Sequence, residues 1–156
     1  MVESLVAISV LLIGVLGPLV LATRAISDGI SYKNKVTASY LAQGGLELLR
    51  SKRDININSS SVYWDNWDND NNSNTNPCIS AVGGCDIADN DSGVVITSCN
   101  VSPYCKITLD SGPTFTRSII ISSGSGGHSV KVEVTITWSE KGVSKSYSLK
   151  SSLFAQ

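Results

Sequence analysis

Carboxylates are the side chains with the most chemical potential in this chain, and they occur in two contexts. Glu3 heads a long apolar run, where a carboxylate is costly unless a cation neutralises it. The other context is a pair of Asn- and Asp-rich clusters whose oxygen ligands at short spacing suit Ca²⁺. These clusters comprise Asp65, Asp68 and Asp70, and Asp86, Asp89 and Asp91. Neither has the spacing and closing Glu of a calcium-binding loop, so solvated Asx-turn loops are favoured and calcium is the alternative.

Four cysteines form the second group of reactive side chains, and all of them lie in the polar part of the chain: Cys78, Cys85, Cys99 and Cys105. An even number of cysteines in a membrane-tethered domain indicates disulfides formed in an oxidising compartment. We expect Cys78 to pair with Cys85 and Cys99 with Cys105 across short loops, although spacing alone does not determine connectivity. Zinc ligation is the weaker alternative, because neither gap is a CxxC and no histidine is near.

The remaining candidate residues offer little chemistry. The single histidine, His128, follows a Gly/Ser run, and no spacing supports a catalytic triad or a phosphate-binding loop. We therefore expect no enzymatic activity and no cofactor. The net charge of −1 gives no electrostatic footprint for nucleic acid. Four asparagines stand in N-x-S/T sequons, which mark surface loops in exported chains but also arise by chance: Asn58, Asn71, Asn90 and Asn100.

The element that must position Glu3 is the apolar run over residues 1–24. It carries no charge between Glu3 and Arg24, and roughly 20 such residues form a helix long enough to cross a bilayer. Its leading charge is negative and the run is longer than a signal peptide's, so we expect a retained segment. The middle of the run is marked as a kink or locally unwound segment by Gly14, Gly17 and Pro18.

The helical pattern continues over residues 25–54, and we predict one continuous helix from about residue 2 to about residue 53. Its second half is amphipathic, so one face of it is expected to carry a sheet. The predicted apolar stripe comprises Ile26, Ile30, Thr37, Leu41 and Leu48, widened by Val36, Tyr40 and Leu49.

The rest of the chain predicts a loop region followed by a sheet. Residues 55–92 are dense in Asn and Asp and predict a long loop region. Residues 93–156 change to a β pattern, clearest where Val130 to Trp138 alternate with polar residues. Glu140-Lys141-Gly142 is typical of a hairpin turn. The predicted fold is α+β: a long N-terminal helix whose second half packs on a small antiparallel sheet of about four strands.

The segment MVESLVAISVLLIGVLGPLV resembles the N-terminal helix of type IV pilins and pseudopilins. The segment TASYLAQGGLELLRSKRD is similar to the end of that helix in bacterial pilins with a small β domain. The resemblance implies a pilin fold, with residues 1–24 anchoring the subunit in the inner membrane before assembly and forming the filament core afterwards. It also implies that Glu3 neutralises the N-terminal ammonium of Met1 on a neighbouring subunit. The alternative is that Glu3 lies at the headgroup level and caps the helix.

Two departures from the family accompany this resemblance. The glutamate stands closer to the start of the chain than it usually does in mature pilins, and the leader with its glycine cleavage site is absent, as in a processed chain. Processing of the N-terminus and its methylation are thus implied by the family alone.

The function implied by the resemblance is that of a structural subunit of a type IV pilus, a helical homopolymer on the cell surface. Adhesion, twitching motility and DNA uptake are its implied roles, and a prepilin peptidase and the pilus assembly machinery are its implied partners. One alternative is a pseudopilin of a type II secretion or competence machine. Another is a membrane-anchored domain that never polymerises and binds calcium or glycan.

Overall fold

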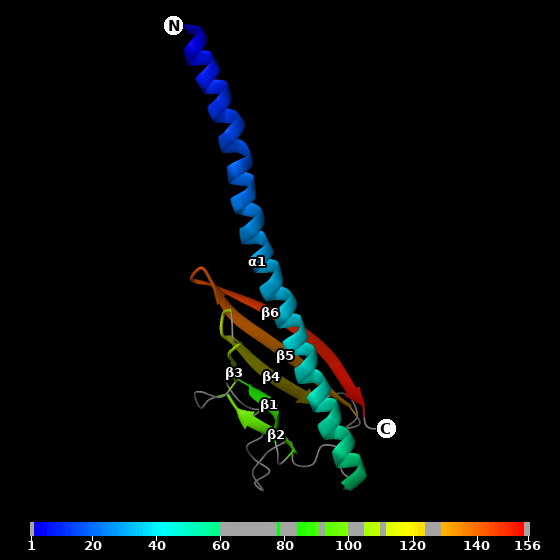
Figure 1. Ribbon diagram of the computed structural model, residues 1–156. Coiled ribbons are helices and arrows are strands. Elements are labelled where there is room, and N and C mark those ends of the chain that lie inside the picture. Colours follow the sequence, from blue (N-terminus) through cyan, green and yellow to red (C-terminus); the bar gives the residue numbers. More distant parts are fainter. Residues whose placement is uncertain are drawn as a thin grey trace. The chain divides into compact units, whose positions relative to one another are not determined.

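A computed structural model of the chain describes residues 2–59, 78, 84–90, 93–99, 105–109, 112–123 and 129–154. These residues form one helix and six strands, which is the α+β class predicted from the sequence (Figure 1). The elements are α1 (Val2–Ser59), β1 (Cys85–Asn90), β2 (Gly93–Ser98), β3 (Lys106–Ile107), β4 (Phe115–Ser123), β5 (Ser129–Glu140) and β6 (Val143–Phe154). The chain divides into two compact units, Met1–Lys35 and Val36–Gln156, which are described separately.

The long helix is continuous, as predicted, but it ends at Ser59 rather than near residue 53. The extra turn runs through Ile-Asn-Ile-Asn, residues of middling helix propensity that the sequence analysis assigned to a loop. Asn56 within it is only 6% exposed. Burial against the rest of the unit therefore outweighs the weak local preference and extends the helix.

The sheet is antiparallel and is built outward from β4, in the order β2-β1-β4-β5-β6. One edge of β4 pairs with β5 over its whole length, from Phe115↔Trp138 to Ser123↔Val130. The other edge is divided between β3 and β1, and β1 contributes a single residue pair, Cys85↔Ile119. The β1–β2 hairpin is thus joined to the sheet through very little ladder pairing.

The hairpin between β5 and β6 has the predicted turn. Glu140 pairs with Val143, and the two residues between them, Lys141 and Gly142, have φ angles of 51° and 79°. Positive φ at both central positions is the signature of a type I′ turn, whose twist matches that of the flanking strands. With the Glu140↔Val143 pair included, twelve residue pairs run in unbroken register down to Ser129↔Phe154. The hairpin is therefore the most regular part of the sheet.

The structure has more strands than the four or so expected, because it places β1 inside the region assigned to a loop. The sequence CDIADN contains one large aliphatic residue and looks too polar for a strand. Ile87 is fully buried, however, and so is Cys85. One buried isoleucine and one buried cysteine are enough to attach this short strand to the core.

The core lies between the sheet and the second half of α1. The helix contributes two alanines and two leucines, Ala38, Ala42, Leu46 and Leu49, all of them buried. The sheet contributes a larger set: Ile87, Phe115, Ile119, Ile121, Val132, Val134, Ile136, Trp138 and Leu153. The rings of Phe115 and Trp138 are 5.8 Å apart between centroids. The buried valines and Trp138 of β5 are those that the alternating pattern predicted.

The predicted apolar stripe of the helix was wrong for several of its largest members. Ile26, Ile30 and Tyr40 are 66%, 55% and 68% exposed. Leu49 is buried as expected, and Leu41 and Leu48 pack partly against the core. Within the unit Val36–Gln156, the helix face that packs on the sheet carries Ala38, Ala42, Leu46 and Leu49, and Tyr40 lies outside it. The 3.6-residue spacing of apolar positions therefore identified a face of the helix that is largely exposed.

Candidate assembly surface

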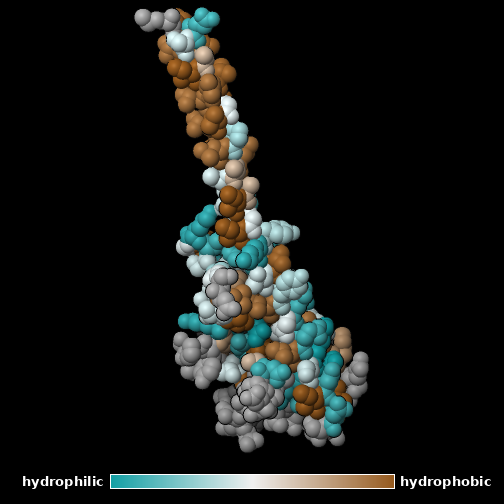
Figure 2. Space-filling view, in the orientation of Figure 1, coloured by the Kyte–Doolittle hydropathy of each residue, from teal (hydrophilic) through white to brown (hydrophobic). Residues whose placement is uncertain are grey.

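The first part of α1 presents an apolar surface that nothing within its own unit covers. Every residue from Val2 to Ile26 is exposed. The helix is long and apolar enough to cross a membrane, and none of its most apolar window is buried in the structure. Figure 2 shows hydrophobic residues over most of this segment. A contiguous exposed apolar surface of this kind marks a site of contact with lipid or with another protein.

Two hydroxyl groups in this apolar segment bond within the helix. Ser9 Oγ donates to the carbonyl oxygen of Val6 at 2.8 Å, and Thr23 Oγ1 donates to that of Val20 at 2.9 Å. Such local hydrogen bonds satisfy hydroxyl groups that have no water to bind in an apolar environment. The segment is thus suited to burial despite its polar residues.

Glu3 is exposed in the first turn of α1. A carboxylate there interacts favourably with the positive end of the helix dipole. The next cationic side chain along the sequence is Arg24, about 30 Å away along a helix that rises 1.5 Å per residue. Met1, the partner implied by the resemblance, lies outside the described residues. No cationic side chain in the described part of this unit is therefore close enough along the helix to pair with Glu3.

The predicted kink residues lie in the interior of the helix, which is assigned as helical throughout. Pro18 has no N–H, so the carbonyl oxygen of Gly14 lacks its usual helical donor. A Cβ atom placed on Gly14 or Gly17 would meet nothing within 4 Å, so neither glycine is required for packing inside this chain. The two glycines lower the helix propensity locally and leave room for a second helix to approach closely.

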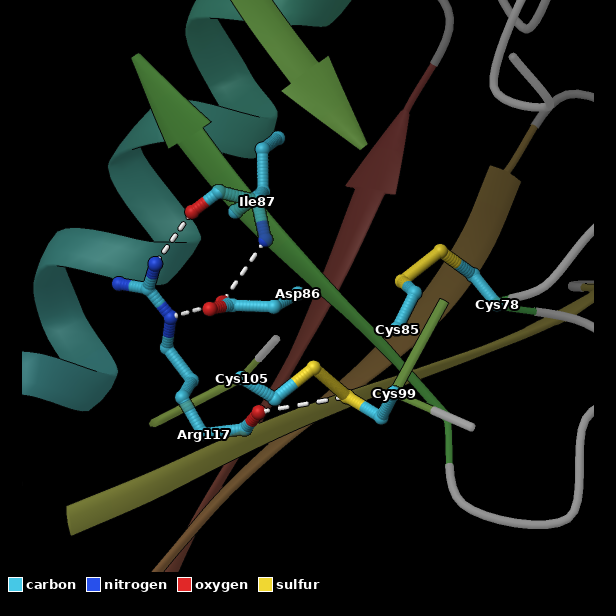
Figure 3. Close-up of a disulfide and its surroundings, with 7 residues drawn as sticks. All are labelled: Cys78, Cys85, Asp86, Ile87, Cys99, Cys105 and Arg117. Carbon is cyan, nitrogen blue, oxygen red and sulfur yellow. Dashed lines mark hydrogen bonds and ion pairs between the residues drawn. A yellow bond between two sulfur atoms is a disulfide. The ribbon is translucent and has the colours of Figure 1, made fainter. Parts of the chain in front are cut away.

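The second unit holds a buried ion pair that the sequence analysis did not identify. Arg117 on β4 is 8% exposed, and its Nε donates to the Asp86 carboxylate while its Nη2 donates to the Ile87 carbonyl (Figure 3). Arg117 occupies an alternate position of β4 between Phe115 and Ile119, whose side chains face the core. This alternation in the sequence could have predicted that Arg117 is buried. β1 and β4 share a single ladder pair, so the hydrogen bonds of the Arg117 guanidinium add a second connection between the two strands.

Both disulfides form as expected, between Cys78 and Cys85 and between Cys99 and Cys105. Their Cα atoms are 4.8 and 5.5 Å apart, as disulfide geometry requires. All four thiols are consumed, so the zinc alternative is wrong. Backbone bonds continue the connection to β4, since Ile121 N donates to the Cys78 carbonyl and Arg117 N to that of Cys105, at 2.9 and 2.8 Å. The disulfides thus hold flanking segments against the central strand.

The acidic clusters and sequons are described only in part. Asp86 Oδ1 accepts hydrogen bonds from Arg117 and from the Ile87 amide, whereas Asp89 is exposed. No group of three or more potential metal ligands occurs within the part of the chain that the structure describes. Asn58 is exposed in the last turn of α1, and Asn90 ends β1. The other predicted residues lie outside the described ranges: Asp65, Asp68, Asp70, Asp91, Asn71, Asn100 and His128.

Comparison with known proteins yields no relative: no protein-family model, no curated protein and no solved structure matches this chain. The function is therefore inferred from its own residues and fold.

Proposed function

We propose that this protein is a structural subunit of a type IV pilus and that it polymerises through its N-terminal helix. The observation that carries the proposal is a single helix with two different halves. Its first half is apolar, exposed and headed by Glu3, and its second half packs on an antiparallel sheet. This arrangement is compatible with the architecture of pilins, which the N-terminal sequence resembles.

Polymerisation gives the apolar surface a partner. As a monomer the subunit keeps residues 2–24 in the membrane, where lipid tails surround them. In the filament, helices of neighbouring subunits take the place of the lipid. Helices whose backbones approach closely at small residues gain van der Waals contact, and Gly14 and Gly17 would allow that approach.

Glu3 sets the register of addition in this mechanism. A carboxylate in an apolar bundle is strongly unfavourable unless a cation pairs with it. The N-terminal ammonium of the adjoining subunit would supply that cation when the two helices are correctly staggered. Any other stagger leaves both charges unpaired in an apolar environment. The charge pair therefore selects the productive docking position rather than adding greatly to the affinity.

The sheet unit forms the outer surface of the filament in this proposal. Two disulfides and the buried Arg117–Asp86 pair reinforce it, as suits a small domain outside the cell. Adhesion, twitching motility or DNA uptake would follow from display on the cell surface. A pseudopilin would share the helix but remain in a short fibre, and an anchored domain would stay in the membrane.

The decisive experiment is electron microscopy of material sheared from the native cells, with the chain identified in it by mass spectrometry. We expect long filaments that contain the wild-type chain and are lost with Glu3→Ala. Glu47→Ala is the matched control, because Glu47 is an exposed helical glutamate paired only with Arg50 among its described ion pairs. Normal filaments from Glu3→Ala would remove the charge-pairing mechanism. A chain found only as a membrane monomer would overturn the polymer itself.

A further inference from the structure

The face of the sheet away from α1 is covered by short hydroxyl side chains. Strand alternation directs the core residues of β4, β5 and β6 to the helix and the intervening residues outward. The outward hydroxyl residues are Thr116, Ser118, Ser122, Thr135, Thr137, Ser139, Ser144, Ser146, Ser148 and Ser152. They stand in register across the strands, and the hydroxyl oxygens of Thr135 and Ser148 are 2.9 Å apart. This face is thus flat, neutral over most of its area and rich in hydrogen-bonding groups.

A shallow open depression of about 420 Å³ interrupts this face, lined by Ile120, Ser122, Lys131, Glu133, Lys150 and Ser152 among others. Its volume lies within the range of about 300–1,000 Å³ typical of small-ligand sites. Ile120, 47% exposed, offers it an apolar surface. Register places Ile120 beside Glu133 and Glu133 beside Lys150, so three strands contribute side chains to one row.

The charges in the depression favour an anion. Lys150 Nζ lies 3.2 Å from Glu133 Oε2, so these two charges largely balance each other. Lys131 forms no ion pair with any residue that the structure describes, and its side chain is exposed at the rim. The depression therefore carries one uncompensated positive charge, with a carboxylate and serine hydroxyls nearby as hydrogen-bonding partners.

We propose that this depression binds an acidic carbohydrate, with a sugar carboxylate on Lys131 and the C–H face of the ring on Ile120. Glu133 and the hydroxyls of Ser122 and Ser152 would bond the sugar hydroxyls, and the flanking hydroxyl rows would accommodate further rings. One isoleucine is too little apolar area to hold an amphipathic helix. The proposal concerns the sheet of one chain and is independent of polymerisation.

The test is isothermal titration of the full chain in detergent micelles with tetragalacturonate, and with galactotetraose as the neutral comparator. We expect tetragalacturonate to bind about tenfold more tightly than galactotetraose, and Lys131→Gln to remove that preference. Ser122→Ala and Ser152→Ala should each weaken binding by a few-fold. Lys145→Gln is the control, since it removes the same charge from a position of β6 outside the depression.

Three outcomes would overturn the proposal. These are no heat of binding at millimolar tetragalacturonate, equal affinity for the neutral oligosaccharide, or the same loss of binding in Lys145→Gln as in Lys131→Gln. The last result would show general attraction of a polyanion rather than a site. All the altered side chains are exposed, and intact disulfide mass with an unchanged melting temperature confirms that each variant is folded.

Discussion

Gly45 of α1 lies directly against Arg117 of β4: a methyl group on Gly45 would stand 3.1 Å from the Cδ atom of Arg117. Arg117 is itself fixed, because its guanidinium binds the Asp86 carboxylate and the Ile87 carbonyl. The helix thus passes over a buried charge pair at a position where it has no side chain. Close packing, rather than backbone flexibility, accounts for the glycine.

Adjacent glycines in the helix allow a matched test of this packing. Gly45→Ala should lower the free energy of unfolding by about 1–3 kcal/mol, since the added methyl group overpacks a site whose neighbour cannot move. Gly44→Ala meets nothing within 4 Å and should raise it by about 0.5–1 kcal/mol through helix propensity. Urea unfolding in micelles, followed by near-ultraviolet circular dichroism, measures both. Stabilisation by both substitutions would show that the Arg117 side chain moves to accommodate the added methyl group.

The buried pair should show strong coupling in a double-mutant cycle. The Arg117 and Asp86 side chains are 9% and 14% exposed. Asp86→Ala leaves a buried guanidinium without its counter-charge and should cost about 3–5 kcal/mol, whereas Asp86→Ala combined with Arg117→Met should cost clearly less. Chemical unfolding of the three variants gives the coupling energy. If the stability losses of the two single variants add up to that of the double variant, the ion pair has no coupling energy.

Each disulfide should contribute measurably to the stability of the sheet unit. Loops closed over separations of 7 and 6 residues are expected to be worth roughly 2–3 kcal/mol each on the chain-entropy estimate. Replacing Cys78 and Cys85 by alanine should cost more than replacing Cys99 and Cys105, because the first pair is essentially fully buried. Melting temperatures of the two double variants decide the order. An inverted order would argue against core packing of the first pair.

Pro18 should weaken the helix around it in the isolated subunit. Pro18→Ala restores the donor to the Gly14 carbonyl and removes a helix-interior penalty of about 3 kcal/mol. Amide exchange of residues 14–22 in micelles should become slower, whereas Leu19→Ala, which leaves the proline in place, should not slow it. Unchanged exchange in Pro18→Ala would show that the surrounding micelle already satisfies the free carbonyl.

The predictions that held depend on local chemistry. Lys141-Gly142 fixes its own turn, and the cysteines that pair are close in sequence. The orientation of the helix depends instead on what packs against it. Tyr40 falls on the predicted apolar stripe, but it is exposed, and Ala38 and Ala42 are the buried residues. Likewise, Arg117 is stable in the core only because Asp86, 31 positions earlier, arrives beside it.

Local sequence likewise predicts some features of the candidate assembly residues, whereas others depend on distant or separate partners. The apolar run and the position of Glu3 are evident from composition and spacing alone. The partner of Glu3 belongs to another copy in the proposed filament, so the pairing is a property of the assembly rather than of one folded chain.

The first and last described elements, α1 and β6, are in contact, and this contact determines when the sheet unit can fold during translation. Arg53, near the end of α1, donates to the Phe154 carbonyl of β6 at 3.2 Å, across 101 positions of sequence, and Leu153 is buried in the core. The helix leaves the ribosome long before the strand that it requires. Contacts between residues so far apart in sequence slow folding, and the sheet unit can finish folding only after β6 has been translated. Until β6 has been translated, the core between α1 and the sheet is incomplete.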